Sequence, residues 1–167
     1  MGSVTALSTP ALLADHHNLD EFRSGVPTLD DWLLRRARPN QIAGASRVFV
    51  TCADNRVVGY YALASSAIAC SDATGRMRRN MPDPIPVVVL ARLAVDRGYQ
   101  GRSIGRGLMR DAALRVLAAA SEIGIRGLVV HAISEDAKAF YLNMGMLPSP
   151  TNELTLMIPL GDLEASL

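Results

Sequence analysis

The stretch LAVDRGYQGRSIGRGLMRDAAL, residues 93–114, decides the fold because its glycines join a strand-like run to a helix-like segment. The apolar run VVVLARLAV (87–95) predicts a buried central strand, and SIGRGLMRDAALRVLAAASEIG (103–124) predicts a long helix. Gly101, Gly105 and Gly107 lie within seven residues. A helix start has unpaired N–H groups and the positive end of a dipole, which favour an anion. The stretch therefore predicts a site for a phosphate-bearing ligand, with a ligand-free turn as the alternative.

Two common phosphate-binding motifs are excluded. No Gly-Lys-Ser/Thr follows the glycines, as a P-loop requires, and no G-x-G-x-x-G dinucleotide fingerprint occurs. We expect no metal, because none of His16, His17 and His131 stands in ligand spacing with Cys52 or Cys70. Both cysteines lie in apolar strand-like runs and are interpreted as small buried residues.

The composition fits one domain that covers residues 1–167. No apolar run approaches the ~20 residues that a membrane span needs, so we expect no membrane association. The start MGSVTALSTP lacks the basic and apolar regions of a secretory signal. These features predict a cytoplasmic protein.

The formal net charge of +1 hides an uneven distribution of charge. Residues 1–126 contain all 16 arginines and 11 acidic residues, which is a balance of +5. Residues 127–167 contain Lys138 and five acidic residues, which is a balance of −4. Arginine suits bidentate contact with phosphate better than lysine does. A GC-rich genome would produce the same preference for arginine, so the pattern has two explanations.

The rest of the sequence predicts an alternation of strands and helices. We expect strands at 4–8, 46–53, 56–70, 87–95, 127–133 and 154–160, and helices that begin at residues 28, 103 and 135. The order β-α-α-β-β-β-α-β-α-β predicts an α/β fold of the mixed α+β kind, with a central mixed sheet and helices on both faces.

Turn and cap residues mark the boundaries between these elements. Thr28 with Asp31 resembles a capping box, and the helix that follows is expected to stop before Pro39. Asp54-Asn55 predicts a tight hairpin. The segment TGRMRRNMPDPIP (74–86) is interpreted as a polar loop.

The stretch LAVDRGYQGRSIGRGLM resembles the acyl-CoA pyrophosphate signature of the GNAT N-acetyltransferases, Q/R-x-x-G-x-G/A after a central strand. The signature fits in two registers, Gln100-x-x-Ser103-x-Gly105 and Arg102-x-x-Gly105-x-Gly107. We prefer the first, because it aligns with the strand and puts Ser103 at the helix N-cap, where Ser and Gly are both favoured. Ser103 is then compatible with the site unless its position requires a positive φ.

The resemblance implies a GNAT fold that binds acetyl-CoA at splayed fourth and fifth strands. SEDAKAFYLNMGM matches the family pattern A-x-x-F-Y-x-x-x-G-F at Ala137, Phe140, Tyr141 and Gly145, with Met146 for the final Phe. In the family this tyrosine protonates the leaving thiolate, and a pKa near ~10 keeps a tyrosine protonated at neutral pH. The alternative for Tyr141 is a packed core aromatic. The acetyl-CoA residues that the resemblance implies are Leu93, Ala94, Val95, Gln100, Gly101, Arg102, Ser103, Ile104, Gly105, Arg106, Gly107, Ser134, Ala137 and Phe140.

The family also implies that the thioester carbonyl accepts a hydrogen bond from a backbone N–H near Ala94 or Val95, which stabilises the oxyanion. No general base is singled out, although His131, Glu135 and Asp136 lie near the right element. A base is unnecessary if the acceptor amine is already weakly basic.

Other stretches, among them RRNMPDPIPVVVLARLAVD and IGIRGLVVHA, resemble the TacT-like toxins of bacterial toxin–antitoxin pairs over most of residues 22–163. This resemblance implies acetylation of the α-amino group of aminoacyl-tRNA, which blocks translation. It also implies a ribbon-helix-helix antitoxin as partner, and a homodimer. The arginines that could contact tRNA phosphates are Arg35, Arg36, Arg38, Arg76, Arg78, Arg79 and Arg92, with a solvated surface as the alternative for each.

Two further functions are compatible with the sequence. One is a stand-alone acetyltransferase for a small amine or a protein N-terminus. The other is a non-catalytic acetyl-CoA-binding module that acts through protein contacts. Tyr141 argues against the module, because binding alone needs no general acid.

Overall fold

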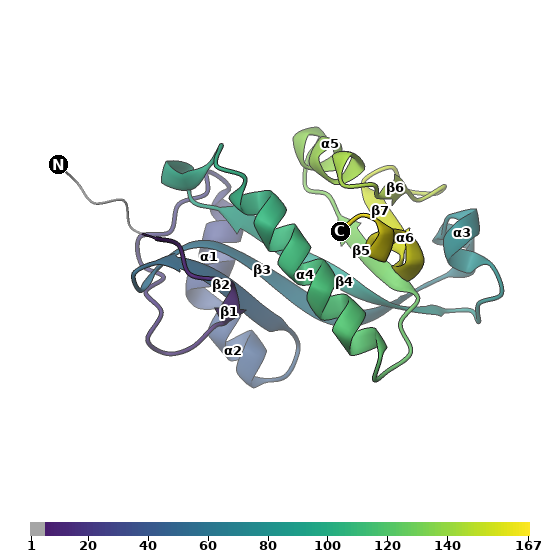
Figure 1. Cartoon of the computed structure of the whole chain (residues 1–167), viewed down its shortest axis with the longest axis horizontal. Helices are drawn as coiled ribbons and strands as arrows, with labels where there is room; N and C mark the ends of the chain where they lie inside the picture. The colour runs from purple at the N-terminus through teal and green to yellow at the C-terminus, as the bar shows by residue number, and fades with distance from the viewer. Residues whose placement is uncertain (1–5) are drawn as a thin grey trace. The chain divides into compact units, whose positions relative to one another are not determined.

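A computed structural model describes residues 6–167, and the chain divides into two compact units (Figure 1). Unit 1 comprises Met1–Leu63 and Arg92–Asp111, and unit 2 comprises Ala64–Ala91 and Ala112–Leu167. Each unit has its own cluster of buried apolar side chains. The single domain over the whole chain stays a prediction.

Three elements continue from one unit into the other along the chain. These elements are β3 (Arg56–Ile68), β4 (Ile85–Val95) and α4 (Ile104–Ala120). The strand β4 and the helix α4 are the two elements that the opening stretch predicts, and the glycine-containing loop joins them in unit 1.

Unit 1 is built on a long antiparallel hairpin. β2 (Arg47–Ala53) pairs with β3, and β1 (Ala11–Leu12) pairs antiparallel with β2. Ala53 and Arg56 face each other across the turn. Asp54 has a φ of 55° in this turn, a left-handed conformation in which Asp is more common than most residues. The hairpin predicted here is therefore confirmed.

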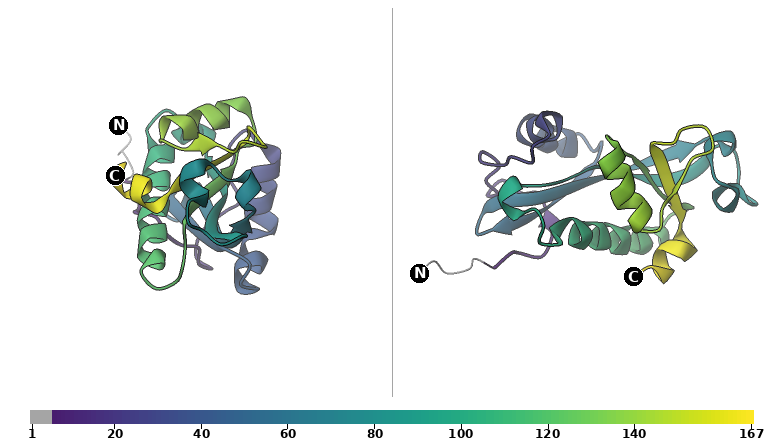
Figure 2. Two further views of the ribbon diagram at one scale, coloured as in Figure 1. Left: turned by 90° about the vertical axis from the view of Figure 1, so that its right-hand side faces the viewer. Right: turned by 90° about the horizontal axis from the view of Figure 1, so that it is seen from above.

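Helices cover both faces of this hairpin (Figure 2). Successive side chains of a strand point to opposite faces. On one face lie α1 (Pro27–Arg35) and α2 (Ala37–Ile42), and on the other lies the start of α4 with Ile104 and Leu108 against Gly59. The core on the α1 side includes Leu29, Leu33, Ala37, Val48, Val50, Tyr60 and Ala62.

The absence of a side chain at Gly59 lets α4 lie close to the hairpin. A Cβ atom there would be 3.0 Å from Thr51 Cγ2, 3.1 Å from Leu108 Cδ1 and 3.3 Å from Ile104 Cγ2. All three distances are short for a Cβ contact. Gly59 therefore determines how closely the start of α4 packs on the strands of unit 1.

Unit 2 contains both parallel and antiparallel strand pairs. β4 pairs in parallel with β5 (Gly127–His131), with Val88 facing Leu128. β5 pairs antiparallel with β7 (Thr155–Pro159), which pairs antiparallel with β6 (Leu147–Pro148). A parallel pair needs a crossover connection, and the segment that contains α4 supplies it. The mixed sheet of the prediction is therefore confirmed.

Three short helices lie against β7 in unit 2, namely α3 (Gly75–Arg78), α5 (Glu135–Asn143) and α6 (Leu160–Ala165). Met77 of α3 is fully buried. It lies over Gly127, where a Cβ atom would come within 2.9 Å of the Met77 sulfur. The glycine at the start of β5 thus makes room for the side chain that attaches α3.

The capping box predicted at the first helix is wrong, whereas its predicted end is confirmed. Val26 is the N-cap of α1 and Pro27 takes its first position, so Thr28 is already helical and forms no capping box. α1 ends at Arg35, before Pro39, as predicted, and Pro39 belongs to the next helix. It lies in the first turn of α2, where a missing N–H costs no hydrogen bond.

Other differences concern short segments. Part of the strand predicted at 4–8 lies outside the described residues, and Leu7 forms only an isolated bridge with Ala53. The predicted loop 74–86 contains α3, whose N-cap Thr74 accepts a hydrogen bond from an N–H of the first turn. It also contains the start of β4. β6 and α6 have no counterpart in the prediction, because segments this short carry no periodicity.

Candidate active site

The loop after β4 is held by a buried carboxylate. Asp96 is 3% exposed. Its Oδ1 accepts the Gly98 N–H at 2.9 Å, and its Oδ2 accepts the Arg23 N–H at 3.0 Å and a guanidinium N–H of Arg56 at 3.3 Å. These bonds start the 3₁₀ turn η2 (Arg97–Tyr99). Asp96 is not among the predicted site residues, although an Asp two residues before a glycine, after an apolar run, is a turn signal.

Gln100 closes the same loop on the strand that precedes it. Its side-chain amide donates hydrogen bonds of 2.9 Å to the carbonyl oxygens of Val95 and Ser24. The Arg97 N–H donates to the Arg23 carbonyl at 2.7 Å. The Gln100 side chain is therefore used by the fold of the loop, so a ligand would meet this loop through backbone N–H groups.

Such N–H groups gather where the loop enters α4. The Gly107 N–H donates the first intrahelical bond to the Ser103 carbonyl at 3.1 Å. The N–H groups of Ser103, Ile104 and Gly105 precede this bond and have no intrahelical acceptor. A Cβ atom at Gly101 or Gly107 would meet nothing within 4 Å, so the backbone is accessible there. This arrangement fits the diphosphate of a coenzyme, because a helix start attracts anions.

Ser103 directly precedes α4, as predicted, but in a strained conformation. Its φ is 63°, and that of Gly101 is 79°. A left-handed φ costs a residue with a Cβ atom roughly 1–2 kcal/mol, whereas glycine tolerates it. The position therefore requires the positive φ that makes Ser unfavourable, and the expected equivalence of Ser and Gly at this N-cap is wrong.

The end of β4 leads into this helix start. Ala94 is buried in the core of unit 1, whereas Leu93 and Val95 are half-buried. The Asp96 N–H donates to the Val58 carbonyl at 2.8 Å, which ties the end of β4 to β3. Arg102 lies with its guanidinium carbon 5.0 Å from the centroid of the Tyr99 ring. Its charge therefore lies beside the loop.

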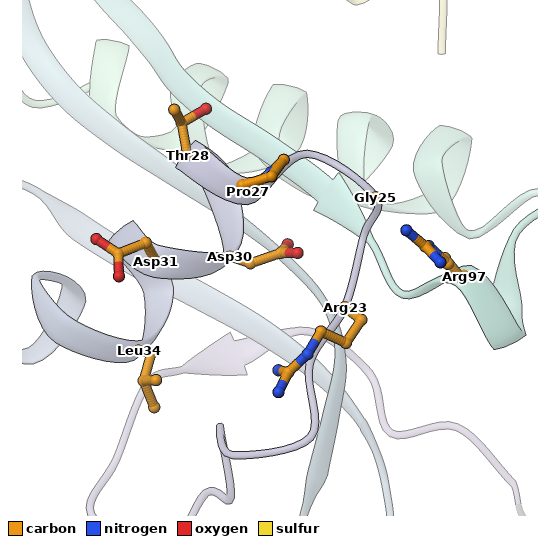
Figure 3. A pocket seen from close by; sticks show the side chains of 8 residues that line it. All are labelled: Arg23, Gly25, Pro27, Thr28, Asp30, Asp31, Leu34 and Arg97. Atoms are coloured by element: carbon orange, nitrogen blue, oxygen red, sulfur yellow. The ribbon is translucent and has the colours of Figure 1, made fainter.

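A cavity of about 630 Å³ opens beside the loop, at the N-terminal end of α1 (Figure 3). Arg97 belongs to the loop itself, and the guanidinium of Arg23 donates to the carbonyls of residues 20 and 22. The cavity is lined by Arg23, Gly25, Pro27, Thr28, Asp30, Asp31, Leu34 and Arg97. Its volume lies in the range of small-molecule pockets. The α1 side of the loop is therefore open to a ligand.

The other predicted site residues lie on α5 in unit 2. Ser134 is the N-cap of this helix, and its Oγ accepts the Ala137 N–H at 3.1 Å. Phe140 packs edge-on against Tyr141, with ring centroids 5.2 Å apart. Ser134 thus starts the helix that carries Tyr141.

Tyr141 is 6% exposed, and burial raises the pKa of its hydroxyl to about 12. Among residues 6–167, no group forms a hydrogen bond with this hydroxyl. The phenol therefore keeps its proton at neutral pH. A protonated hydroxyl without an internal partner can donate to a substrate, as a general acid must.

No general base stands out near α5. His131 Nδ1 lies 2.9 Å from Thr155 Oγ1 at the end of β5. Glu135 and Asp136 occupy the first turn of α5, where negative charge complements the helix dipole. Within residues 6–167, no cluster of His, Cys, Asp and Glu side chains is placed to hold a metal ion. Nor does any helix in this part of the chain have the length and apolar character for crossing a membrane.

The acetyltransferase (GNAT) domain family matches residues 44–145 of the chain. The chain belongs to the GNAT acetyltransferase family. The tRNA-acetylating toxin of Mycobacterium tuberculosis is 50% identical over 162 residues, which cover 97% of this chain and 98% of that protein. The probable toxin TacT of Sinorhizobium fredii is 25% identical over 90% of each chain.

Solved structures of GNAT toxins share the fold over nearly the whole chain. A tyrosine-to-phenylalanine mutant of KacT is 27% identical with a TM-score of 0.90, covering 96% of this chain and 99% of that one. AtaT complexed with acetyl-methionyl-tRNAfMet is 29% identical with a TM-score of 0.88, covering 96% and 98%. The predicted fold is therefore confirmed, and the chain is an acetyl-CoA-dependent N-acetyltransferase of the TacT-like branch.

Arginines in unit 1 of this GNAT enzyme differ in what they contact. Arg35 is exposed and pairs with Asp31 at 2.7 Å, and Arg36 is exposed at the end of α1. Arg38 is half-buried, and its guanidinium donates to the carbonyls of residues 14, 15 and 17. Arg38 therefore holds the segment before α1, which leaves less of its guanidinium for a ligand.

Arg92 of the GNAT enzyme stacks on Trp32, which is not among the predicted site residues. Its guanidinium carbon lies 4.3 Å from the centroid of the Trp32 ring. The sequence marks Trp32 only as the beginning of an apolar helix face. No local signal could have revealed the pair, because the two residues are distant in the chain.

Four arginines of unit 2 lie on or beside α3, namely Arg76, Arg78, Arg79 and Arg126. Arg78 and Arg79 are exposed, and no ion pair to either is present within residues 6–167. Arg76 pairs with Asp162 at 2.5 Å. Arg126 donates to the Arg76 carbonyl at 2.6 Å. Arg78 and Arg79 are thus the arginines of α3 that remain available for a ligand.

Proposed function

We propose that this GNAT enzyme transfers the acetyl group of acetyl-CoA to the α-amino group of aminoacyl-tRNA and thereby blocks translation. The observation that carries the proposal is the 50% identity, over 97% of the chain, to a protein named tRNA-acetylating toxin. The structure of AtaT with acetyl-methionyl-tRNAfMet supports it from a second relative. The high content of arginine in residues 1–126 is compatible with an RNA substrate.

In the proposed reaction, the free amine of the aminoacyl ester attacks the thioester carbonyl carbon. A C–N bond forms and the C–S bond breaks, and the Tyr141 hydroxyl gives its proton to the departing thiolate. The amine nitrogen releases a proton to solvent, and solvent returns one to Tyr141. The α-amine of an aminoacyl ester is weakly basic, so the reaction needs no protein base, in keeping with the absence of a distinct candidate near α5.

Two backbone regions are proposed to hold the acetyl donor. The N–H groups of Arg102–Gly105, which precede the first intrahelical bond, would bind the diphosphate at the start of α4. An N–H near Ala94 or Val95 would donate to the thioester oxygen, whose negative charge grows in the transition state. The loop between these regions is shaped by Asp96 and Gln100, so its geometry is set before the donor binds.

Four exposed arginines and the half-buried Arg92 are proposed to contact the tRNA backbone. Arg35, Arg36, Arg78, Arg79 and Arg92 would meet phosphates rather than bases, so each should contribute about equally for all accepted tRNAs. Binding should weaken with rising salt, because phosphate contacts release counterions.

The proposal includes a cytoplasmic location, a ribbon-helix-helix antitoxin and a homodimer. The AtaT toxin has been solved bound to the C-terminus of its antitoxin AtaR, and the AtaT–AtaR complex has been solved on DNA. An antitoxin gene should therefore lie next to the gene of this chain. Light scattering of the purified chain should give twice the monomer mass, and a monomer would contradict the homodimer.

Incubation with radiolabelled acetyl-CoA and total charged tRNA tests the substrate. Free amines and proteins compete in the same mixture, and deacylated tRNA is the matched control. We expect label on charged tRNA, and none on deacylated tRNA. Label on small amines or protein N-termini instead would establish the stand-alone acetyltransferase. Binding of acetyl-CoA without any acetylated product would establish the binding module.

A further inference from the structure

Arg92 rests on an aromatic platform on the α1 side of β4. Its guanidinium carbon lies 4.3 Å from the centroid of the Trp32 ring. Trp32 in turn stacks on Tyr60, with centroids 6.0 Å apart and ring planes 10° apart. The buried Tyr60 hydroxyl donates to the Leu29 carbonyl at 2.7 Å. The platform is therefore fixed to both β3 and α1.

The edge of the Arg92 guanidinium has no protein partner in the part of the chain that the structure describes. Within residues 6–167, no carboxylate pairs with Arg92 and no hydrogen bond to its guanidinium is present. The other half-buried arginines of unit 1 are engaged, Arg38 with carbonyls and Arg56 with the Asp96 carboxylate at 3.3 Å. A guanidinium presents its donors in one plane, and that plane matches the two oxygens of a phosphate. One face of the Arg92 guanidinium is thus stacked on Trp32, and its edge is available to a ligand.

Arg92 also stands next to the backbone that is proposed to hold the thioester. Arg92 directly precedes Leu93. Ala94 lies two residues after Arg92, which corresponds to about 7 Å along a strand. Ala94 and Trp32 belong to one apolar cluster, so Arg92 and Ala94 share the α1 face of β4. α4 lies on the opposite face of the hairpin of unit 1. An acceptor that brings its amine to the thioester from the α1 side would pass Arg92.

We infer that Trp32 is a positioning residue, which presents the Arg92 guanidinium to a phosphodiester near the aminoacylated 3′ end of the tRNA. The inference rests on the proposed function. Stacking limits the conformations of Arg92 before binding, so less entropy is lost when the phosphate is bound. The contact positions the acceptor end and reads no base, so it serves every accepted tRNA alike.

Substitutions of both residues test the inference. Arg92→Lys keeps the charge but loses the planar fork and most of the stack, and Trp32→Leu removes the platform. Both should raise KM and Kd for charged tRNA roughly tenfold, as for the loss of a charge-assisted hydrogen bond. KM for acetyl-CoA should stay near wild type in both variants, and Tm should stay near wild type in Arg92→Lys. Arg47→Lys is the matched control and should change nothing, because among the described residues 6–167 the Arg47 guanidinium donates only to the Gln41 and Ser46 carbonyls and lies over no aromatic ring.

The salt dependence of binding separates geometry from charge. Arg92→Lys should leave the slope of log K against log salt unchanged, because the charge remains. Arg92→Gln should reduce the slope by about 0.7, which corresponds to one phosphate of a single strand. Trp32→Phe keeps a smaller ring and should give an intermediate Kd, which maintains the test if Trp32→Leu does not fold.

Opposite results would overturn the inference. Wild-type Kd for charged tRNA in folded Arg92→Lys and Trp32→Phe would show that the stack only supports α1. So would a fall in Tm with a rise in KM for acetyl-CoA while tRNA binding is unchanged. A wild-type enzyme that neither binds nor acetylates charged tRNA would instead overturn the proposed function, and this inference with it.

Discussion

The hydroxyl of Tyr141 is buried and protonated, and its removal separates acid catalysis from packing. Tyr141→Phe keeps the ring that packs against Phe140. We expect turnover to fall roughly 10²–10⁴-fold, the range of general acid–base groups. Acetyl-CoA affinity and Tm should stay near wild type. Steady-state kinetics and calorimetry measure these effects, and wild-type turnover in the variant would mean that water protonates the thiolate.

Ser103 has a left-handed backbone conformation, which is unfavourable for a residue with a Cβ atom. Ser103→Gly should remove the roughly 1–2 kcal/mol cost of a left-handed φ. The greater freedom of glycine in the unfolded chain offsets about 0.5–1 kcal/mol of this gain. The free energy of unfolding should therefore rise by roughly 0.5–1 kcal/mol in urea titrations. Ser121→Gly, at a position without a positive φ, should instead lower it, and an equal effect of both changes would contradict the strain.

At the scale of elements, the close approach of α4 to the hairpin of unit 1 depends on Gly59. Gly59→Ala adds a Cβ atom within 3.3 Å of three side-chain carbons. The overpacking should cost about 1–3 kcal/mol of the free energy of unfolding. It should also weaken acetyl-CoA binding, because the helix start that is proposed to bind the diphosphate is displaced.

Gly161→Ala is the control for this element. A Cβ atom at Gly161 of α6 would meet nothing within 4 Å, and alanine favours a helix, so stability should rise by about 0.5–1 kcal/mol. Thermal unfolding and titration calorimetry with acetyl-CoA measure both variants. If Gly59→Ala matches wild type in both measurements, the neighbouring side chains relax and Gly59 does not set the position of α4.

For the whole molecule, two buried tyrosines make stability depend on alkaline pH. Burial raises the pKa of Tyr141 to about 12, and it also raises the pKa of Tyr60. Unfolded tyrosines lose their proton near pH 10. Above that pH the unfolded chain binds fewer protons than the folded one, so the free energy of unfolding falls as pH rises from about 10 to 12.

The stability contribution of these tyrosines is fully present below pH 10. Urea titrations at several pH values between 9 and 11.5 measure the fall above it. Tyr141→Phe should reduce the slope by up to one proton, or about 1.4 kcal/mol per pH unit. Identical slopes in the variant and the wild type would show that Tyr141 titrates alike in both states.

Several features of fold and site could be predicted from short stretches of sequence. The hairpin at Asp54 and the helix end near Gly145, whose φ is 92°, were predictable because turn residues act locally. β6 and α6 were not predictable, because two and six residues leave too little periodicity to detect. The capping box at Thr28 failed because Pro27 can begin a helix one residue earlier.

The sequence by itself determined the strand, loop and helix around residues 93–114, and with them the family, because this pattern of apolar and glycine residues is local. Only the tertiary structure decided that Asp96 anchors the loop, that Ser103 is strained and that Arg92 stacks on Trp32. These three properties depend on backbone angles and on partners from distant parts of the chain. Such partners meet only when packing brings β3, α1 and the end of β4 together in unit 1.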